Sequence, residues 1–146
     1  MTTARMKELM VGVLEKYDGI LTGYEDKNEG TLQLTFAADN LESIDVFVCL
    51  SVMDDGAMIA SLSCYDLVSF ENNYAAGLTV CNKANDDDMV KYYIDEDKDT
   101  VVHAIELFNA YGVACDFDPA KVLLRAIMIA LAVDEAYPVF AKAKWA

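Results

Sequence analysis

Two stretches in which apolar residues recur at every second position constrain the fold of this chain most strongly. The recurring positions are Ile44, Val46, Val48, Leu50 and Val52 in the first stretch, and Met58, Ala60, Leu62 and Cys64 in the second. A period of two is typical of a β-strand that buries one face. The turn-forming segment Asp54-Asp55-Gly56 separates the stretches, so the pattern predicts a β-hairpin from Ile44 to Cys64.

Two further hairpins are predicted on the same grounds. The segment Tyr24–Phe36 alternates in its second half and carries the turn residues Asn28-Glu29-Gly30. The segments Met89–Ile94 and Thr100–Glu106 are rich in β-branched and aromatic residues and flank an acidic turn. The sequence therefore predicts strands that come in pairs joined by short turns.

Helical spacing appears in three other segments. The range Thr2–Asp18 has apolar residues at i, i+3 and i+4, with Thr2 or Thr3 as cap, and Ser69–Asn85 repeats this spacing with Ser69 as the predicted N-cap. The last helix is predicted to begin at Asp118-Pro119, a capping residue followed by proline. Gly77 lies inside the second helix at a cost of about 1 kcal/mol relative to alanine, which indicates close packing there.

The last predicted helix differs from the others. Its middle, Ala126–Val133, is apolar on every side, which predicts a central buried element. Pro138 removes one backbone hydrogen bond, so we expect a kink or a break near Tyr137.

These elements together predict an α+β fold, an antiparallel sheet of hairpins flanked by helices in the order α-ββββ-α-ββ-α. The chain has 146 residues and shows neither an internal repeat nor a linker. That length is ordinary for one domain, so residues 1–146 are expected to form a single domain.

Charge limits the classes of partner. The chain has 25 acidic and 11 basic residues and a net charge of -14, which disfavours binding to nucleic acid and to anionic membranes. Residues 17–82 hold eleven acidic residues and one basic residue, whereas the segment from Lys121 onward is mildly basic. The acidic part predicts either a surface for basic protein partners or a contribution to solubility alone.

The segment Met1–Val13 has no apolar core of the kind found in signal peptides, and the longest apolar run has eight residues. We therefore expect a cytoplasmic protein without a membrane segment. Its cysteines, Cys49, Cys64, Cys81 and Cys115, show no paired spacing, and they are predicted to be reduced and mostly buried.

The acidic turn has the carboxylate spacing of a calcium loop. Asp95, Asp97 and Asp99 are two residues apart, and Glu106 occupies the twelfth position. The sixth position, where such loops need glycine, is Thr100, and the flanking segments are predicted strands instead of helices. A solvated hairpin turn is the favoured interpretation, and a divalent-cation site is the alternative.

Other polar groups do not form a recognisable catalytic set. His103, the single histidine, is expected half-buried on a strand face with Val101 and Ile105. Asp86-Asp87-Asp88 are expected in a polar loop after the second helix. Because no nucleophile, orienting carboxylate or metal-ligand spacing accompanies them, we expect no catalytic residue, no cofactor and no metal.

Asn82 and Asn85 are unusual because asparagine is a poor helix former. Asn85 is predicted to take the left-handed conformation at the helix C-terminus. Asn82 is predicted to tie the helix end to the neighbouring strand through its side-chain amide, so that replacing it with alanine lowers thermal stability.

Three ordered stretches of the second half resemble the YbjN family of bacterial proteins. They are Leu78–Asn85, Lys91–Asp97 and Asp134–Phe140. The residues that carry the resemblance are Asn82, Asn85, Tyr93, Asp95, Asp97, Tyr137 and Pro138. The first half is similar only in the order of its elements, and the family usually has a glycine in the acidic turn where this chain has Lys98 and Asp99.

The resemblance implies a fold like that of type III secretion chaperones, which commonly dimerise, and the role of a bacterial sensory transduction regulator. It brings no ligand and no catalytic residue, and it gives the motif residues structural roles. The leading hypothesis is a non-enzymatic, homodimeric, chaperone-like module that holds a basic or apolar segment of a protein partner. A small-ligand or divalent-cation sensor at the acidic turn is the alternative, and an enzyme is third.

Overall fold

The computed structural model describes residues 1–87 and 90–145, and these residues form three helices and six strands. In chain order they are α1 (Thr3–Lys16), β1 (Leu21–Asn28), β2 (Thr31–Ala37), β3 (Ser43–Val52), β4 (Met58–Ser69), α2 (Tyr74–Asp87), β5 (Lys91–Ile94), β6 (Asp99–Phe108) and α3 (Pro119–Lys144). The three predicted hairpins are therefore present.

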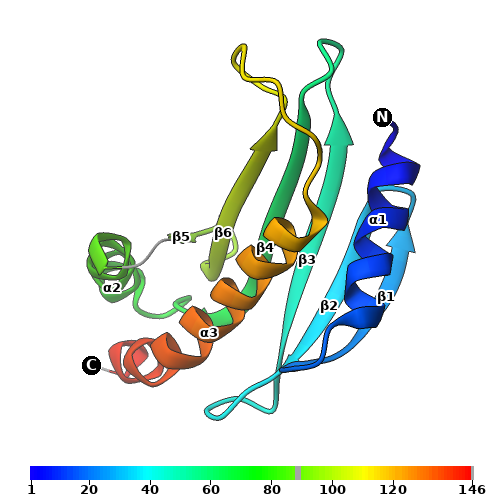
Figure 1. The fold of residues 1–146 in the computed structure, drawn as a ribbon. Coiled ribbons are helices and arrows are strands. Elements are labelled where there is room, and N and C mark those ends of the chain that lie inside the picture. Colours follow the sequence, from blue (N-terminus) through cyan, green and yellow to red (C-terminus); the bar gives the residue numbers. More distant parts are fainter. Residues whose placement is uncertain (88–89, 146) are drawn as a thin grey trace.

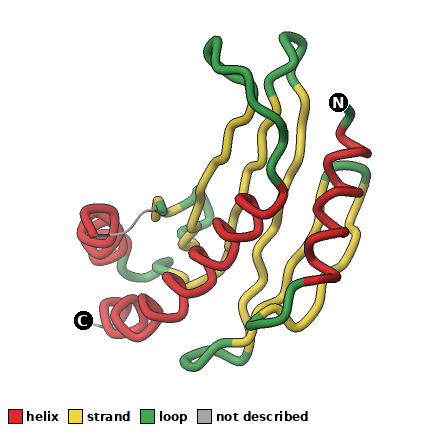
Figure 2. Tube along the Cα trace, viewed as in Figure 1, coloured by secondary structure: helices red, strands yellow, loops and turns green. Residues whose placement is uncertain are grey.

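The strands form one curled antiparallel sheet in the order β1-β2-β3-β4-β6-β5. Figure 1 shows α3 crossing the sheet diagonally, with α1 on one side of it and α2 on the other. In Figure 2, α1 and α3 lie in front of the strands, and α2 lies beside the edge of the sheet near β5. The predicted α+β class with an antiparallel sheet is confirmed.

Strand register assigns each side chain to one of two faces, because residues directly opposite each other share a face. Leu34 pairs with Val46, Val48 pairs with Leu62, and Leu62 pairs with Ala104. This inner face, together with the helices, forms the core. The largest fully buried side chains are Tyr92, Phe36, Phe70, Phe140, Met6, Met10, Leu32, Leu34, Leu62, Ile129, Val46 and Val48.

The predicted helix starts at Thr2 and Asp118 are confirmed. The Thr2 hydroxyl accepts a hydrogen bond from the Arg5 backbone N–H at 3.1 Å, and the Asp118 carboxylate accepts one from Lys121 at 3.2 Å. Each side chain satisfies a backbone donor that has no partner inside the helix. Gly56 supplies the left-handed conformation of the β3–β4 turn, with φ +90°.

The prediction that Ser69 begins the second helix is wrong. Ser69 is the last residue of β4 and pairs with Asp99, and α2 begins at Tyr74. Phe70 lies outside the helix, is fully buried, and donates its backbone N–H to the Lys98 carbonyl at 2.8 Å. The spacing of Phe70, Tyr74 and Leu78 imitates a helix face, but Tyr74 and Leu78 are exposed and α2 buries Gly77, Val80 and Cys81 instead.

The expectations for the last helix need two changes. The helix continues through Pro138 without a break, and Figure 1 shows its red C-terminal turns running in a different direction from its orange N-terminal turns, as expected for a proline kink. Burial is not complete, because Leu131 is 54% exposed on the side away from the sheet.

Close packing at Gly77 is confirmed, because a Cβ placed there would lie 2.7 Å from Cγ of Phe70. We expect Gly77→Ala to lower the free energy of unfolding by about 1–3 kcal/mol, although alanine is the better helix former. Gly12 of α1 is the matched control, since a Cβ there meets nothing within 4 Å. Gly12→Ala should raise stability by up to about 1 kcal/mol. Urea unfolding followed by circular dichroism measures the change in stability of both variants. If the two substitutions change the free energy of unfolding in the same direction, close packing at Gly77 is contradicted.

Candidate interaction surfaces

The outer face of the sheet carries exposed apolar side chains on four neighbouring strands. Its rows follow from the register: Tyr65 pairs with Val101, Ser61 with Ile105, and Ile59 with Leu107. We call six residues of this face the outer patch: Phe47, Ile59, Tyr65, Tyr93, Ile105 and Leu107. The exposed fractions are 51% for Ile105, 50% for Tyr65, 47% for Tyr93 and 40% for Leu107.

An antiparallel sheet with one solvated face normally presents polar residues there. The outer patch departs from this rule in two parts, with Tyr65 and Tyr93 on one side of the paired Ser63 and His103 and with Ile59, Ile105 and Leu107 on the other side. Exposed apolar groups that gather on one face often mark an interaction site. The rings of Phe47 and Tyr65 contact each other, with centroids 5.7 Å apart. Acidic turns lie at both ends of these strands, Asp54-Asp55 after β3 and Asp95-Glu96-Asp97 before β6.

Helix α3 has a second exposed apolar surface. Its side toward the sheet is buried through Val122, Ala126 and Ile129, each at 0% exposure. On the opposite side Leu124 and Leu131 are 57% and 54% exposed, and Met128 between them is half-buried. We call Leu124, Met128 and Leu131 the α3 stripe.

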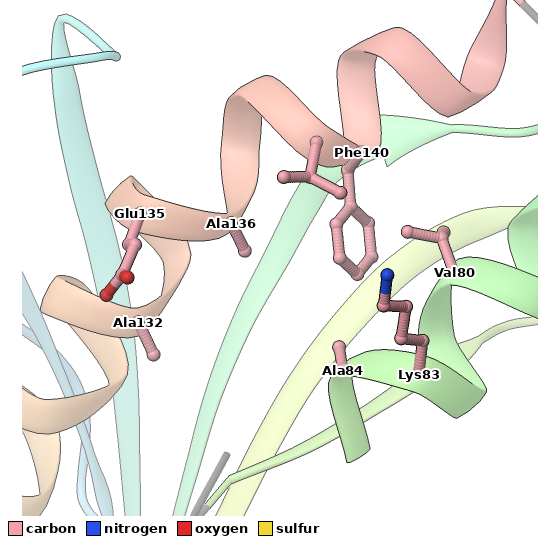
Figure 3. A pocket seen from close by; sticks show the side chains of 8 residues that line it. Val80, Lys83, Ala84, Ala132, Glu135, Ala136 and Phe140 are labelled. Carbon is pink, nitrogen blue, oxygen red and sulfur yellow. The ribbon is translucent and has the colours of Figure 1, made fainter. Parts of the chain in front are cut away.

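A groove lies on each side of α3. The groove against α2 has a volume of about 250 Å³ and is shown in Figure 3. In that view Lys83 of α2 extends its amino group toward Phe140, while Glu135 of α3 lies on the opposite wall. Among the ion pairs of the described residues none joins Lys83 to Glu135. The groove against α1 has a volume of about 370 Å³ and is lined by Val13, Lys16, Tyr17, Ala120, Leu123, Leu124 and Ile127.

The acidic turn is built around one carboxylate. Oδ1 of Asp95 accepts the backbone N–H of Asp97 and of Asp99, each at 2.9 Å. This carboxylate therefore stabilises the hairpin turn, as the favoured interpretation requires. Asp97 is exposed. In the part of the chain that the structure describes, no group of three or more His, Cys, Asp or Glu side chains is arranged to hold a metal ion.

Lys98 is one of the two residues, with Asp99, found where the YbjN pattern usually has a glycine. Its φ is 67°, in the left-handed region that glycine adopts freely. Its amino group lies 4.5 Å from the centre of the Tyr74 ring, a cation–π contact that links the turn to the start of α2.

The predicted roles of the two asparagines are wrong in detail. Asn85 lies inside α2 and not in a left-handed cap. It accepts the backbone N–H of Tyr92 at 2.6 Å and donates its amide to the Tyr92 carbonyl at 2.9 Å. Asn85 thus makes the helix-to-strand tie predicted for Asn82, whereas Asn82 is exposed. The residue that reaches β5 is the one a turn further along the helix.

The remaining motif residues lie in different places. Tyr93 belongs to the outer patch, Tyr137 packs partly buried against the core, and Pro138 is exposed. Asp134, the first residue of the resembling stretch Asp134–Phe140, is a structural anchor. Its carboxylate accepts the backbone N–H groups of Asp39 and Asn40 at 3.0 and 2.8 Å, which holds α3 to the loop between β2 and β3.

Glu106, the twelfth position of the calcium-loop spacing, does not belong to the acidic turn and is not exposed. It lies on the inner face, opposite Ala60, at 6% exposure. Its carboxylate contacts Nη2 of Arg125 at 2.7 Å and Nζ of Lys121 at 3.6 Å. Both cations come from α3, so this ion pair fastens the first turns of the helix to the sheet.

His103 is half-buried on the outer face, as predicted. Its Nδ1 lies 3.0 Å from the Ser63 hydroxyl on the next strand. Among the described residues, no carboxylate is hydrogen-bonded to its ring, so the orienting group of a hydrolytic triad has no counterpart there.

Burial raises the pKa of the Cys81 thiol to about 11, which keeps it protonated and unreactive near neutral pH.

The prediction that the cysteines are mostly buried holds for half of them. Cys64 and Cys81 are buried, whereas Cys49 and Cys115 are exposed, and no disulfide joins them. Asp86 and Asp87 belong to the last turn of α2 and not to a loop. Asp88 and the predicted strand start at Met89 lie outside the described residues.

Across the described residues, none of the helices combines the length and apolar character needed to cross a bilayer. No family model matches the chain, and no match was found among the curated proteins compared with it. The two apolar surfaces and the charge around them are therefore the features of the molecule that bear on its function.

Proposed function

We propose that this chain is a non-enzymatic, chaperone-like protein-interaction module of the YbjN type that acts as a cytoplasmic homodimer. Its partner is a protein segment that combines apolar with basic residues. The observation that carries the proposal is the outer patch, an uncovered apolar area on the face of the sheet that the helices leave open.

The chemistry of the partner follows from the patch and its surroundings. Ile105 and Leu107 supply exposed aliphatic area, and Tyr65 and Tyr93 add rings with a polar end. Contact with apolar side chains of another protein removes these groups from water, which makes binding more favourable. Aromatic residues often contribute most to that binding free energy. The net charge of -14 and the acidic turns at the strand ends favour a partner with basic residues.

The type III secretion chaperone-like fold and the regulator role are parts of this proposal. They rest on the resemblance of the second half of the chain to the YbjN family, and the helix-covered antiparallel sheet is compatible with them. The sensor alternative finds less support, because the Asp95 carboxylate already accepts two backbone N–H groups. The geometry therefore favours the interaction module.

A peptide-binding experiment tests the proposal. The probe is a short fluorescent peptide of alternating leucine and lysine, and its binding is measured by fluorescence anisotropy. A serine–lysine peptide of equal charge and a leucine–glutamate peptide are the controls for charge alone and for apolar area alone. We expect the leucine–lysine peptide to bind best and to weaken with added salt.

Variants locate the binding. Ile105→Ser combined with Leu107→Ser should weaken binding of the leucine–lysine peptide about tenfold or more. Leu124→Ser is the matched control, because Leu124 is similarly exposed but lies on α3. If the double variant binds this peptide as tightly as the unmodified chain, the outer patch is not the binding surface and the proposal is overturned.

A further inference from the structure

The α3 stripe lies at the centre of the helix-covered side of the molecule. A helix on the surface of a protein normally turns polar residues away from the sheet. Here Leu124 and Leu131 occupy those positions and are more than half exposed, with Met128 between them. The described chain leaves this apolar side of the helix uncovered.

The spacing of the stripe is that of a helix-pairing surface. Before the change of direction at Pro138, the outward positions are Leu124, Met128, Leu131 and Glu135, at intervals of four, three and four residues. An alternation of four and three residues, about 3.5 on average, keeps side chains directed at a second helix in a coiled coil. The grooves against α1 and α2 lie on either side, so the surface offers a ridge with a hollow on each flank, a shape suited to another helix.

The charge of the molecule indicates which helix pairs with the α3 stripe, namely α3 of a second copy. Two copies of a chain with a net charge of -14 repel each other across most of their surfaces. Helix α3 carries Lys121, Arg125, Lys142 and Lys144 against Asp134 and Glu135, and the Glu106 carboxylate beneath it pairs with the first two cations, so four positive and three negative charges leave +1. This helix is therefore nearly neutral, so two copies repel each other less there than across their acidic surfaces, and a basic partner gains little there.

The order of charges along the helix also gives a direction. Lys121 lies seven residues before Met128 and Glu135 lies seven residues after it. Lys121 lies 3.6 Å from Glu106 of its own chain, but its side chain is 54% exposed and can reach a second copy. If two copies pair antiparallel about Met128, Lys121 of each faces Glu135 of the other on both sides of the two-fold axis. A parallel pair places each of these residues against its own like-charged equivalent. A two-fold interface needs this kind of self-complementary surface.

We propose that two copies of this chain associate through the α3 stripe, α3 against α3, antiparallel and centred on Met128. The inference rests on the homodimer of the proposed function and assigns its interface. It also separates the two apolar surfaces, with α3 for the second copy and the outer patch for the partner segment.

The first test measures molecular mass against concentration by analytical ultracentrifugation. We expect the unmodified chain to dimerise and Leu131→Glu to raise the dimer dissociation constant at least about 100-fold, because a two-fold axis places the change twice in the interface. Ile105→Glu is the matched control, since Ile105 is similarly exposed but lies on the outer patch. This variant should leave the dimer intact. Circular dichroism checks that both variants are folded.

A crosslinking experiment tests the direction and the centre. Met128→Cys is made in a background with Cys49→Ser and Cys115→Ser, which removes the exposed native thiols. Mild oxidation should give a disulfide-linked dimer, because residue 128 lies at the centre of the proposed antiparallel pair. In such a pair equivalent residues meet only at the centre, whereas in a parallel pair they meet along the whole helix. The same background carrying Lys121→Cys should not form the link.

The outcomes separate the two proposals. A dimer that survives Leu131→Glu and is lost in Ile105→Glu overturns the α3 interface and leaves a homodimer. A chain that stays monomeric at all concentrations overturns the interface and the homodimer together. Binding of the leucine–lysine peptide is measured separately and depends on the outer patch.

Discussion

Replacing Arg125 with leucine is expected to lower the free energy of unfolding by about 3–5 kcal/mol. The change removes a cation that lies 2.7 Å from the Glu106 carboxylate, and Glu106 is only 6% exposed. What remains is a buried carboxylate with Lys121 at 3.6 Å as its nearest cation. Removing one partner of a buried ion pair costs more free energy than the intact pair contributes to stability. The remaining charge is still desolvated and no longer has its partner. Urea unfolding followed by circular dichroism measures the change.

Two comparisons make this expectation specific. The exposed pair Arg5–Glu8, at 3.0 Å, is the matched control, and Arg5→Leu should change stability by less than about 1 kcal/mol. Combining Arg125→Leu with Glu106→Leu should recover most of the loss, because both charges are then absent. A single Arg125 variant as mild as the Arg5 variant would show that the buried carboxylate does not depend on α3.

Asn85→Ala is expected to lower the free energy of unfolding by about 2–4 kcal/mol, because it removes two hydrogen bonds to the Tyr92 backbone at once. Tyr92 lies in the short edge strand β5, and its own side chain is 2% exposed. Loss of the amide therefore loosens both the strand edge and a large core ring. Thermal and urea unfolding measure the effect.

Neighbouring variants separate this role from helix propensity. Asn82→Ala changes the same residue type in the same helix at an exposed position, and it should stay within about 0.5 kcal/mol of the unmodified chain. Asn85→Asp keeps an acceptor for the Tyr92 N–H and loses the amide donor, so an intermediate loss is expected. Equal effects of the two alanine variants would contradict the tie between α2 and β5.

The sheet could be predicted because its signals are local. Alternation in β3 and the Asp54-Asp55-Gly56 turn depend on neighbouring residues, and so do the caps at Thr2 and Asp118. The start of α2 could not be predicted, because Phe70 belongs to the core through contacts with residues far along the chain. Its ring lies against Phe140, with centroids 6.4 Å apart.

The candidate surfaces were harder to predict than the fold. The apolar run Ala126–Val133 predicts burial, but sequence alone does not show that the molecule leaves one side of the helix uncovered. The sequence carries a signal for the outer patch, since alternation places Val101, His103 and Ile105 on one strand face. Only the register shows that Tyr65 and Tyr93 extend that face across neighbouring strands.

Helix α3 follows all six described strands along the chain, and this order has a consequence for biosynthesis. The hairpins β1–β2 and β3–β4 consist of neighbouring segments and can pair soon after they leave the ribosome. Helix α1 emerges first and packs against one part of their apolar inner face (Figure 1). The part beneath α3 stays open until residues 119–144 emerge and Asp134 reaches back to Asp39 and Asn40. A nascent chain that stalls before Pro119 therefore exposes apolar sheet surface. Cellular chaperones can bind that surface, or aggregation can begin there.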